Sequence, residues 1–279
     1  MKNTKIKGFF IELGWYEYCY VMGLAAYIFD LDYTLVENKA FRYACELLPR
    51  RIGLGVSPEV FCEVFLDTYY QLVRKGELYR AFDWCYVAKL TAEKFGGRMR
   101  ERMFLELFLD GVDMGLVKVC DGAISLLRRI KSLGNIVVIL TNGYGKYQIP
   151  VIRKIRLDKY IDAIFTAEKL PKPKPHSDSF DVVMEYSKRK LGAEKIFFIG
   201  DHPFFDIYGA LNAGIKNIFW VDKNIKEGIY SVEEISGLIE GYTLRRYGVH
   251  ITIDTSRGQK VVVVNSLKSI QEKFWELFL

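Results

Sequence analysis

The chain has 279 residues, of which 50% are apolar and 27% are charged. A chain of this length and composition can bury a sizeable core, so we expect a globular protein with one large domain and a smaller one. The net charge of +6 is modest and is spread along the sequence, which does not fit a nucleic-acid-binding protein.

The five cysteines are scattered along the chain and include no Cys-x-x-Cys pair. An odd number at these spacings argues against a disulfide framework and against a zinc site. A reducing cytoplasm is the location that fits this cysteine usage best.

The first residues superficially resemble a signal peptide or a membrane anchor, because lysines precede an apolar run over residues 9–27. Glu12 and Glu17 interrupt that run and would be costly within a bilayer, so we expect neither an anchor nor a membrane partner. A second hypothesis is that the natural product starts at Met22 and that the extension 1–21 comes from an upstream start codon.

Residues 25–35 form the most informative stretch, an apolar strand that runs into two acids and a hydroxyl. Side chains two positions apart on a strand point the same way, so Asp30 and Asp32 share one face. Two carboxylates held this close repel each other unless a cation or a chemical task balances them. The alternative is a solvated acidic turn. A helix-loop-helix calcium loop is excluded because its further acids and central glycine are missing.

Several amphipathic helices are expected between residues 37 and 116. The best defined begins at Ser57-Pro58-Glu59, where a capping serine precedes a first-turn proline, and it ends at Gly76. Further helices are expected over 39–51, 79–95 and 98–109, with Gly53, Gly96-Gly97 and Gly111 as their ends. This pattern indicates a small helical bundle.

From Cys120 onward the pattern alternates between helix and strand. The expected helices cover residues 121–133, 148–159, 179–191 and 206–213, and the expected strands cover 136–140, 163–165, 195–199 and 217–221. Strands separated by helices of this length predict an α/β fold with a doubly wound parallel sheet.

The last fifty residues predict an additional hairpin and a closing helix. Residues 249–254 alternate like a half-buried strand, residues 255–258 form a turn, and residues 260–264 read as a buried strand.

Three of the apolar strands end in polar residues, which are Asp30, Asp32 and Thr34, then Thr141 and Asn142, then Asp201 with Asp206. Ligands of open parallel sheets bind at the carboxyl ends of the strands, so these groups should converge. The stretch 171–175, Pro-Lys-Pro-Lys-Pro, presents lysines between the second and third groups. Acids, a hydroxyl, an amide and a lysine predict a site for magnesium and a phosphoryl group.

These four motifs, in this order over about residues 24–225, resemble the haloacid dehalogenase-like superfamily and in particular its phosphatase branch. The resemblance implies a Rossmann-like core in which Asp30 is the nucleophile and forms an aspartyl-phosphate. It implies that Asp32 is the general acid and base, and that the Thr141 hydroxyl binds the phosphoryl group with help from the backbone of Asn142.

For the cofactor, we expect magnesium at a site formed by Asp30, Asp32, Asp201 and Asp206. The resemblance implies that Asp201 binds the ion directly and that Asp206 orients a metal-bound water or the lysine. Two lysines compete for the third motif. Lys174 keeps the family's usual spacing to a following phenylalanine, whereas Lys172 reproduces only the Lys-Pro-x-Pro portion, so we favour Lys174 as the catalytic and substrate-binding lysine.

The sequence also departs from the family pattern at Tyr33, His202 and Phe205, where glycine, serine and asparagine are frequent. None of these departures removes a functional atom from the proposed site.

The spacing of the motifs places an accessory domain after the first one. Far more residues separate Asp32 from Thr141 than a crossover connection needs. We therefore expect a helical cap over residues 37–116 and a core made of residues 22–36 and 117–279. Cap residues that could reach a substrate are Tyr69, Tyr70, Arg74, Lys75, Tyr79, Arg80 and Trp84. For each of them the alternative is a place in the helix core or on a solvated face.

The expected function is that of a magnesium-dependent phosphatase for a small phosphorylated metabolite. A phosphomutase of the same fold is the first alternative, and it would yield an isomeric phosphate ester in place of free phosphate. A non-catalytic binding protein conflicts with the presence of every catalytic carboxylate. A dehalogenase is disfavoured because those relatives lack the acid found at Asp32.

Overall fold

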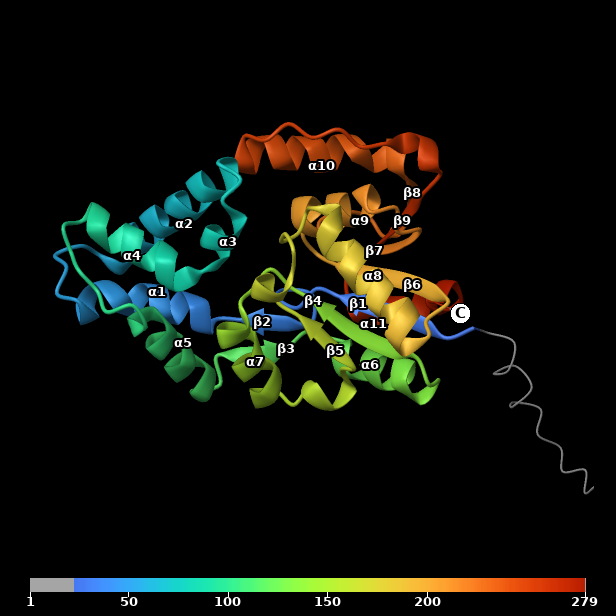
Figure 1. The fold of residues 1–279 in the computed structure, drawn as a ribbon, viewed down its shortest axis with the longest axis horizontal. Helices are drawn as coiled ribbons and strands as arrows, with labels where there is room; N and C mark the ends of the chain where they lie inside the picture. The colour runs from blue at the N-terminus through green and yellow to red at the C-terminus, as the bar shows by residue number, and fades with distance from the viewer. Residues whose placement is uncertain (1–22, 279) are drawn as a thin grey trace, which may run out of the picture.

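The computed structural model describes residues 23–278, which fold as a central sheet with helices on both faces and a further group of helices beyond one end of the sheet (Figure 1). The hypotheses about residues 1–21 and a start at Met22 lie outside the described residues. Within residues 23–278, no helix combines the length and the apolar character that crossing a membrane requires.

The main sheet has seven strands in the order β5-β4-β1-β6-β7-β9-β8. The strands are β1 (Ala25–Phe29), β4 (Ile136–Leu140), β5 (Ala163–Phe165), β6 (Lys195–Gly200), β7 (Asn217–Val221), β8 (Gly228–Ser231) and β9 (Lys260–Val264). Neighbouring strands are parallel except for β8, which runs antiparallel to β9. The structure thus confirms the predicted α/β fold with a mostly parallel sheet.

β1 lies inside the sheet, between β4 and β6, and this position explains its composition. Phe29 pairs with Ile139 on one side and with Ile199 on the other. Every residue of β1 and β4 is buried, because helices cover both faces of the sheet. The last residues of these strands therefore bring the polar groups that follow them to one edge.

Two clusters of buried side chains fill the space between the sheet and its helices. One face is covered by α6 (Ala123–Ser132), α7 (Gly145–Lys154) and α11 (Leu267–Lys273). The other is covered by α8 (Ser177–Leu191), α9 (Gly209–Asn212) and α10 (Val232–Tyr247). Alternate residues of β1 enter the two clusters, as the two-residue period of a strand requires.

A short antiparallel pair, β2 (Val36–Asn38) and β3 (Val117–Val119), leads from the sheet into a group of helices. We call residues 40–113 the helical insertion. Its helices are α1 (Ala40–Arg51), α2 (Pro58–Arg74), α3 (Leu78–Phe82), α4 (Trp84–Lys94) and α5 (Met103–Asp113). The predicted helical bundle is confirmed.

Two details of the helical prediction are wrong. The expected helix over 79–95 is two helices, because Asp83 is extended and its carboxylate caps α4 by accepting a hydrogen bond from the Cys85 N–H. Gly111 does not end a helix. It lies inside α5, where an added Cβ would come within 3.0 Å of the Ala40 Cβ, so the glycine permits the close contact of α5 with α1.

The predicted strand over residues 249–254 is also wrong. This segment forms no strand, and its alternating pattern arises because Ile251 and Ile253 pack against the core clusters without joining a ladder. β9 pairs with β7 and β8 instead of forming a hairpin with this segment. The closing helix is confirmed as α11.

α10 was not among the predicted helices, and it begins at a capping box. The Ser231 side chain accepts a hydrogen bond from the Glu234 N–H, and the Glu234 carboxylate accepts one from the Ser231 N–H. Two other boundaries differ from the predictions. α7 spans Gly145–Lys154 instead of 148–159, and a π-helical turn over Pro203–Tyr208 precedes α9 in place of one helix over 206–213.

Candidate active site

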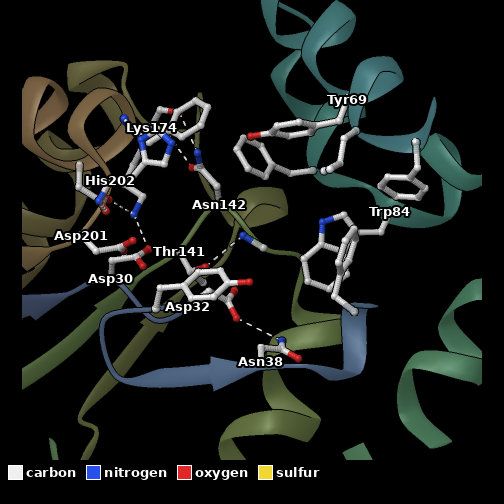
Figure 2. A pocket seen from close by; sticks show the side chains of 18 residues that line it. Asp30, Asp32, Asn38, Tyr69, Trp84, Thr141, Asn142, Lys174, Asp201 and His202 are labelled. Carbon is white, nitrogen blue, oxygen red and sulfur yellow. Dashed lines mark hydrogen bonds and ion pairs between the residues drawn. The ribbon is translucent and has the colours of Figure 1, made fainter. Parts of the chain in front are cut away.

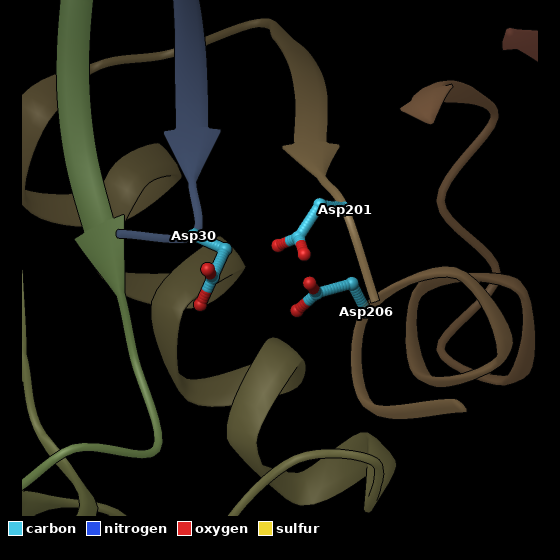
Figure 3. Close-up of side chains that lie close together, drawn as sticks. All are labelled: Asp30, Asp201 and Asp206. Carbon is cyan, nitrogen blue, oxygen red and sulfur yellow. The ribbon is translucent and has the colours of Figure 1, made fainter. Parts of the chain in front are cut away.

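Three carboxylates meet at the carboxyl edge of the sheet (Figure 3). Asp30 follows β1, Asp201 follows β6, and Asp206 lies one turn further in the π-helical segment. Each offers one oxygen, and these oxygens all lie within 4.8 Å of one another. The three acids converge because β1 and β6 are neighbours and parallel, so their carboxyl ends share one edge.

The surroundings of this carboxylate group disfavour its accumulated negative charge. Burial, and then the nearby Asp206 and Asp32, raise the pKa of Asp30 to about 7, against the opposing effect of Lys174. Burial and the charges of Asp206 and Asp30 likewise raise the pKa of Asp201 well above its usual range. A cation at this point would relieve both effects.

The structure distinguishes the two candidate lysines. The Lys174 ammonium is buried, and its Nζ lies 2.6 Å from Asp30 Oδ1 and 2.5 Å from Asp206 Oδ1. Burial lowers the pKa of this lysine, but the two carboxylates outweigh it and raise the pKa above its usual value. Lys172 lies on the surface, where it pairs with Asp178 at 2.9 Å.

The residues after β4 hold Lys174 in place. The Asn142 side chain donates a hydrogen bond of 2.8 Å to the Lys174 carbonyl and accepts one of 2.8 Å from the Lys174 N–H. The neighbouring Thr141 is buried, and its hydroxyl oxygen accepts a hydrogen bond from the Gly143 N–H at 3.1 Å. Both residues line the cavity described below. The sequence had indicated a role for the Asn142 backbone, whereas the structure shows that its side chain holds the backbone of Lys174.

The Asp32 carboxylate lies apart from the group of three acids. Its Oδ1 accepts a hydrogen bond of 3.2 Å from the Asn38 amide, and its Oδ2 accepts one of 2.6 Å from the Gln148 amide. Burial raises the pKa of Asp32, and these two donors oppose the increase. Sequence reasoning missed both partners. Gln148 comes from α7, 116 residues away, and nothing in its local sequence signals this contact.

A layer of hydrogen bonds surrounds the other acids. The Thr34 hydroxyl donates to Asp201 Oδ1 at 3.0 Å, and the His202 N–H donates to Asp206 Oδ2 at 3.0 Å. His202 Nδ1 accepts hydrogen bonds from the N–H groups of Phe204 and Phe205, so the neutral ring carries its proton on Nε2. Burial lowers the pKa of His202 to about 4, which keeps the ring uncharged near neutral pH.

A cavity of about 240 Å³ lies between these polar groups and the helical insertion (Figure 2). The polar groups Asp30, Asp32, Thr141, Asn142, Lys174, Asp201 and Asp206 all line it. The insertion contributes Phe41, Phe65, Leu66, Tyr69, Phe82 and Trp84.

Of the cap residues proposed from the sequence, only Tyr69 and Trp84 line this cavity. Arg74 donates instead to the Tyr247 carbonyl, Arg80 pairs with Glu77, and the Tyr79 hydroxyl contacts the carbonyls of residues 170 and 171. Tyr70 and Lys75 are not among the lining residues either.

The donor set fits a divalent cation that prefers oxygen ligands. Magnesium is commonly held by one or two carboxylates together with water and phosphate oxygens, and three carboxylates converge here in a buried site. Lys174 already neutralises part of their charge, and a phosphorylated ligand would bring further negative charge. The group of three does not include Asp32.

Comparison with known proteins agrees with this geometry. A family profile described as "Haloacid dehalogenase-like hydrolase" matches residues 27–220. The glyceraldehyde 3-phosphate phosphatase of Methanothermobacter thermautotrophicus is 25% identical over 224 residues, which are 77% of this chain and 93% of that protein. The Pyrococcus furiosus enzyme of the same name is 28% identical over 127 residues, 43% of this chain, and the match spans only 52% of its length.

Among solved structures, the HAD-hydrolase YfnB from Bacillus subtilis, bound to magnesium, matches with a TM-score of 0.55 and 20% identity. The match covers 74% of this chain and 92% of that one, and at this identity it shows the shared fold. The family profile extends over most of the chain, from inside β1 to inside β7. The chain therefore belongs to the haloacid dehalogenase-like hydrolase family.

Proposed function

We propose that the protein is a magnesium-dependent phosphatase that hydrolyses a small phosphorylated metabolite through an aspartyl-phosphate on Asp30. The observation that supports this proposal most directly is the position of the Asp30 carboxylate. It follows β1, lines the cavity and contacts the Lys174 ammonium. The names of the relatives, which are phosphatases of small phosphate esters, support the same reaction class.

In the first step, a carboxylate oxygen of Asp30 attacks phosphorus and the bond to the leaving alcohol oxygen breaks. Two anions approach each other in this step, so positive charge and hydrogen-bond donors must offset their repulsion. The Lys174 ammonium would supply positive charge, and the Thr141 hydroxyl would supply a hydrogen-bond donor. Bound magnesium, held by Asp30, Asp201 and Asp206, would supply positive charge to the phosphoryl oxygens.

Asp32 is suited to move the proton in both steps. Burial raises its pKa, so its protonated form can donate a proton to the departing alkoxide. The resulting carboxylate then takes a proton from a water molecule, which attacks phosphorus and releases phosphate from Asp30. Asn38 and Gln148 hold the carboxylate during both transfers.

The helical insertion would act as the main part of a cap that encloses this reaction, with residues 37–116 as cap and residues 22–36 and 117–279 as core. Its side chains form one wall of the cavity, while the carboxylates and Lys174 form the other. Enclosure of this kind keeps bulk water from the reacting groups and strengthens electrostatic interactions within the site.

The test is phosphate release from an aryl phosphate, with and without magnesium, by the wild type, by Asp30→Asn and by Asp254→Asn. Asp254 is an exposed acid that caps a short turn and does not line the cavity, so its change is the matched control. We expect magnesium-dependent release that is lost in Asp30→Asn and retained in the control. Wild-type rates in Asp30→Asn would refute the mechanism.

The same assay separates the phosphatase from a phosphomutase. Phosphorus NMR of a sugar phosphate incubated with the enzyme would show free phosphate for a phosphatase. An isomeric phosphate ester without free phosphate would instead establish the mutase.

A further inference from the structure

We infer, on the basis of the proposed phosphatase function, that the alcohol part of the substrate is apolar or aromatic and carries no second anionic group. The inference rests on the wall of the cavity that faces the reacting groups. That wall is the part of the site that a leaving group would contact once the phosphoryl group lies against Asp30 and Lys174.

The helical insertion contributes no charged side chain to the cavity. The lining residues that it supplies are Phe41, Phe65, Leu66, Tyr69, Phe82 and Trp84. Their only polar side-chain atoms are the Tyr69 hydroxyl and the Trp84 indole nitrogen. Figure 2 shows Tyr69 and Trp84 on the opposite side of the cavity from Asp30 and Asp201. A leaving group that extends away from the phosphoryl group therefore meets an apolar surface.

Ring-to-ring contacts hold this wall in place before any ligand binds. The Phe41 ring lies 5.0 Å from Trp84 and 5.2 Å from Phe65, measured between ring centroids. Phe82 lies 5.2 Å from Phe205, which belongs to the core. The contact between Phe82 and Phe205 joins the wall to the segment that carries Asp206. A preformed aromatic surface binds apolar groups without first having to order its own side chains.

The charges around the cavity disfavour a second anion on the substrate. Among the lining residues that the structure describes, Lys174 is the only lysine or arginine, and its ammonium already contacts Asp30 and Asp206. His202 also lines the cavity, but both of its ring nitrogens already have partners, since Nδ1 accepts from two backbone N–H groups and Nε2 contacts the Tyr247 hydroxyl. A carboxylate or second phosphate on the leaving group would lose water without gaining a cationic partner.

The cations of the insertion that could have served this purpose are engaged elsewhere. Arg74 donates to the Tyr247 carbonyl, and Arg80 pairs with Glu77 and lies over the Tyr86 ring. Substrates of the sugar-acid or bisphosphate type therefore lack a recognition group here. Phosphate monoesters of alkyl or arylalkyl alcohols fit the site, because their alcohol part is apolar like the wall and carries no charge that would need a cationic partner.

The experiment compares hexyl phosphate, 3-phenylpropyl phosphate and 6-phosphooxyhexanoate, which adds a carboxylate to a similar chain. All three are esters of primary alcohols, so differences in intrinsic reactivity are small. We expect kcat/KM for the two apolar esters to exceed that for the carboxylate ester by about tenfold or more, the scale on which a pocket discriminates such groups.

A gain-of-function variant tests the wall directly. Leu66 lines the cavity and is 40% exposed, so Leu66→Lys places a cation there at little risk to folding. Val60 is 43% exposed on the same helix but does not line the cavity, so Val60→Lys is the matched control. We expect Leu66→Lys to raise relative activity on the carboxylate ester by about tenfold, and Val60→Lys to leave the ratio unchanged.

The outcomes separate the two claims. Phosphate release from all three esters with equal rates, or with a preference for the carboxylate ester, would overturn the inference and leave the phosphatase function standing. An identical ratio in Leu66→Lys and Val60→Lys would also overturn it. Absence of phosphate release from every ester, and from an aryl phosphate with magnesium present, would refute the phosphatase function itself.

Discussion

The amide nitrogen of Gln148 lies 2.6 Å from Oδ2 of Asp32, although 116 residues separate the two in the chain. Gln148 is fully buried in α7, and its amide oxygen has no hydrogen-bond partner among the described residues. The hydrogen bond to Asp32 is therefore the main polar interaction of this side chain. A donor to a carboxylate stabilises the charged form, which is the form that must accept a proton from water in the proposed second step.

We predict that Gln148→Leu lowers activity most at acidic pH. Loss of the donor raises the pKa of Asp32 further, because burial then acts with less opposition. The carboxylate form becomes scarcer as the pH falls, so the acid limb of the kcat profile moves to higher pH. A hydrogen bond to a charged group contributes about 1.5–3 kcal/mol, so a loss of about tenfold or more is expected at pH 6. The measurement is kcat between pH 5 and pH 9.

Gln259→Leu is the control for this experiment. Gln259 is also a buried glutamine, and its amide donates to the carbonyls of Leu211 and Ile215, outside the cavity. Its replacement should lower thermal stability without moving the pH profile. A parallel loss of kcat at every pH in Gln148→Leu would show that the contact positions Asp32 without tuning its ionisation.

We predict opposite outcomes for two neighbouring lysines. Lys174→Met leaves Asp30 and Asp206 buried without their shared partner, and breaking a buried ion pair in this way costs about 3–5 kcal/mol of folding free energy. Activity should fall about a hundredfold or more, as for other groups that stabilise charge in a transition state. Lys172→Met should stay within about twofold of wild type, because exposed ion pairs contribute little. Rate assays and chemical denaturation of both variants measure these effects. A larger loss in Lys172→Met than in Lys174→Met would contradict the assignment of Lys174 as the catalytic lysine.

The sequence predicts the sheet and the helices of the insertion well because their signals are local. β1 and β4 are continuous apolar runs between polar ends, and α2 has a serine cap with proline in its first turn. It fails for residues 249–254, because an alternating pattern reports which side chains are buried and not whether the backbone pairs with another strand. α10 has a local signal too, because Ser231 and Glu234 have the spacing of a capping box, but it was not predicted.

Within the site, too, some residues could be predicted from local sequence and others could not. The residues that carry charge stand at strand ends, where motif spacing and strand order bring Asp30, Asp201 and Asp206 together. The residues that position them come from elsewhere in the chain. Gln148 and the Asn142 side chain contact their partners only through tertiary packing, so no local pattern in the sequence could indicate them.

We predict that magnesium stabilises the folded protein independently of turnover. A cation held by the three carboxylates relieves their repulsion, and at a hundred times its Kd it would add about 2.7 kcal/mol to the free energy of unfolding. Thermal unfolding with magnesium and with EDTA measures this. The stabilisation should be lost in Asp201→Asn, which keeps an oxygen for the Thr34 hydroxyl, and retained in Asp254→Asn. Equal stabilisation of Asp201→Asn would place the ion elsewhere.

We predict a pH-dependent contribution to stability from Glu227, which does not line the cavity. Hydrogen bonds from Lys273, Ser269 and the Asn265 N–H lower its pKa from 4.5 to about 2. Between these values the unfolded chain binds the proton more readily, so the contribution is complete above pH 4.5 and is lost as the pH falls toward 2. Glu227→Gln should therefore unfold at a lower temperature than wild type at pH 7, with the difference shrinking from pH 5 to pH 3.

The control for Glu227 is Glu185→Gln. The Glu185 carboxylate is 57% exposed and pairs with Arg189 along one helix face, so its removal should change the unfolding temperature little at any pH. A difference between Glu227→Gln and wild type that stayed constant from pH 7 to pH 3 would show that packing, and not ionisation, accounts for the effect.

The last prediction concerns Tyr247, which joins the core to the helical insertion. It is 2% exposed at the end of α10, and its ring lies 5.7 Å from Tyr70 of the insertion and 5.4 Å from Phe205 of the core. The Arg74 side chain donates to its carbonyl at 3.1 Å, and the His202 ring contacts its hydroxyl at 2.8 Å. α10 therefore joins the insertion to the core, and Figure 1 shows it running from beside α2 toward β8.

Two substitutions separate the packing of Tyr247 from its hydroxyl group. Tyr247→Phe keeps the ring and removes the hydroxyl, which hydrogen-bonds His202 and the Tyr69 side chain, so we expect a loss of about 1–2 kcal/mol in chemical denaturation. Tyr247→Ala leaves a cavity between core and insertion, and we expect a loss of about 3–5 kcal/mol. Hydrogen exchange in α2 should accelerate in the alanine variant and stay near wild type in the phenylalanine variant. Unchanged exchange in α2 of Tyr247→Ala would show that other contacts hold the insertion against the core.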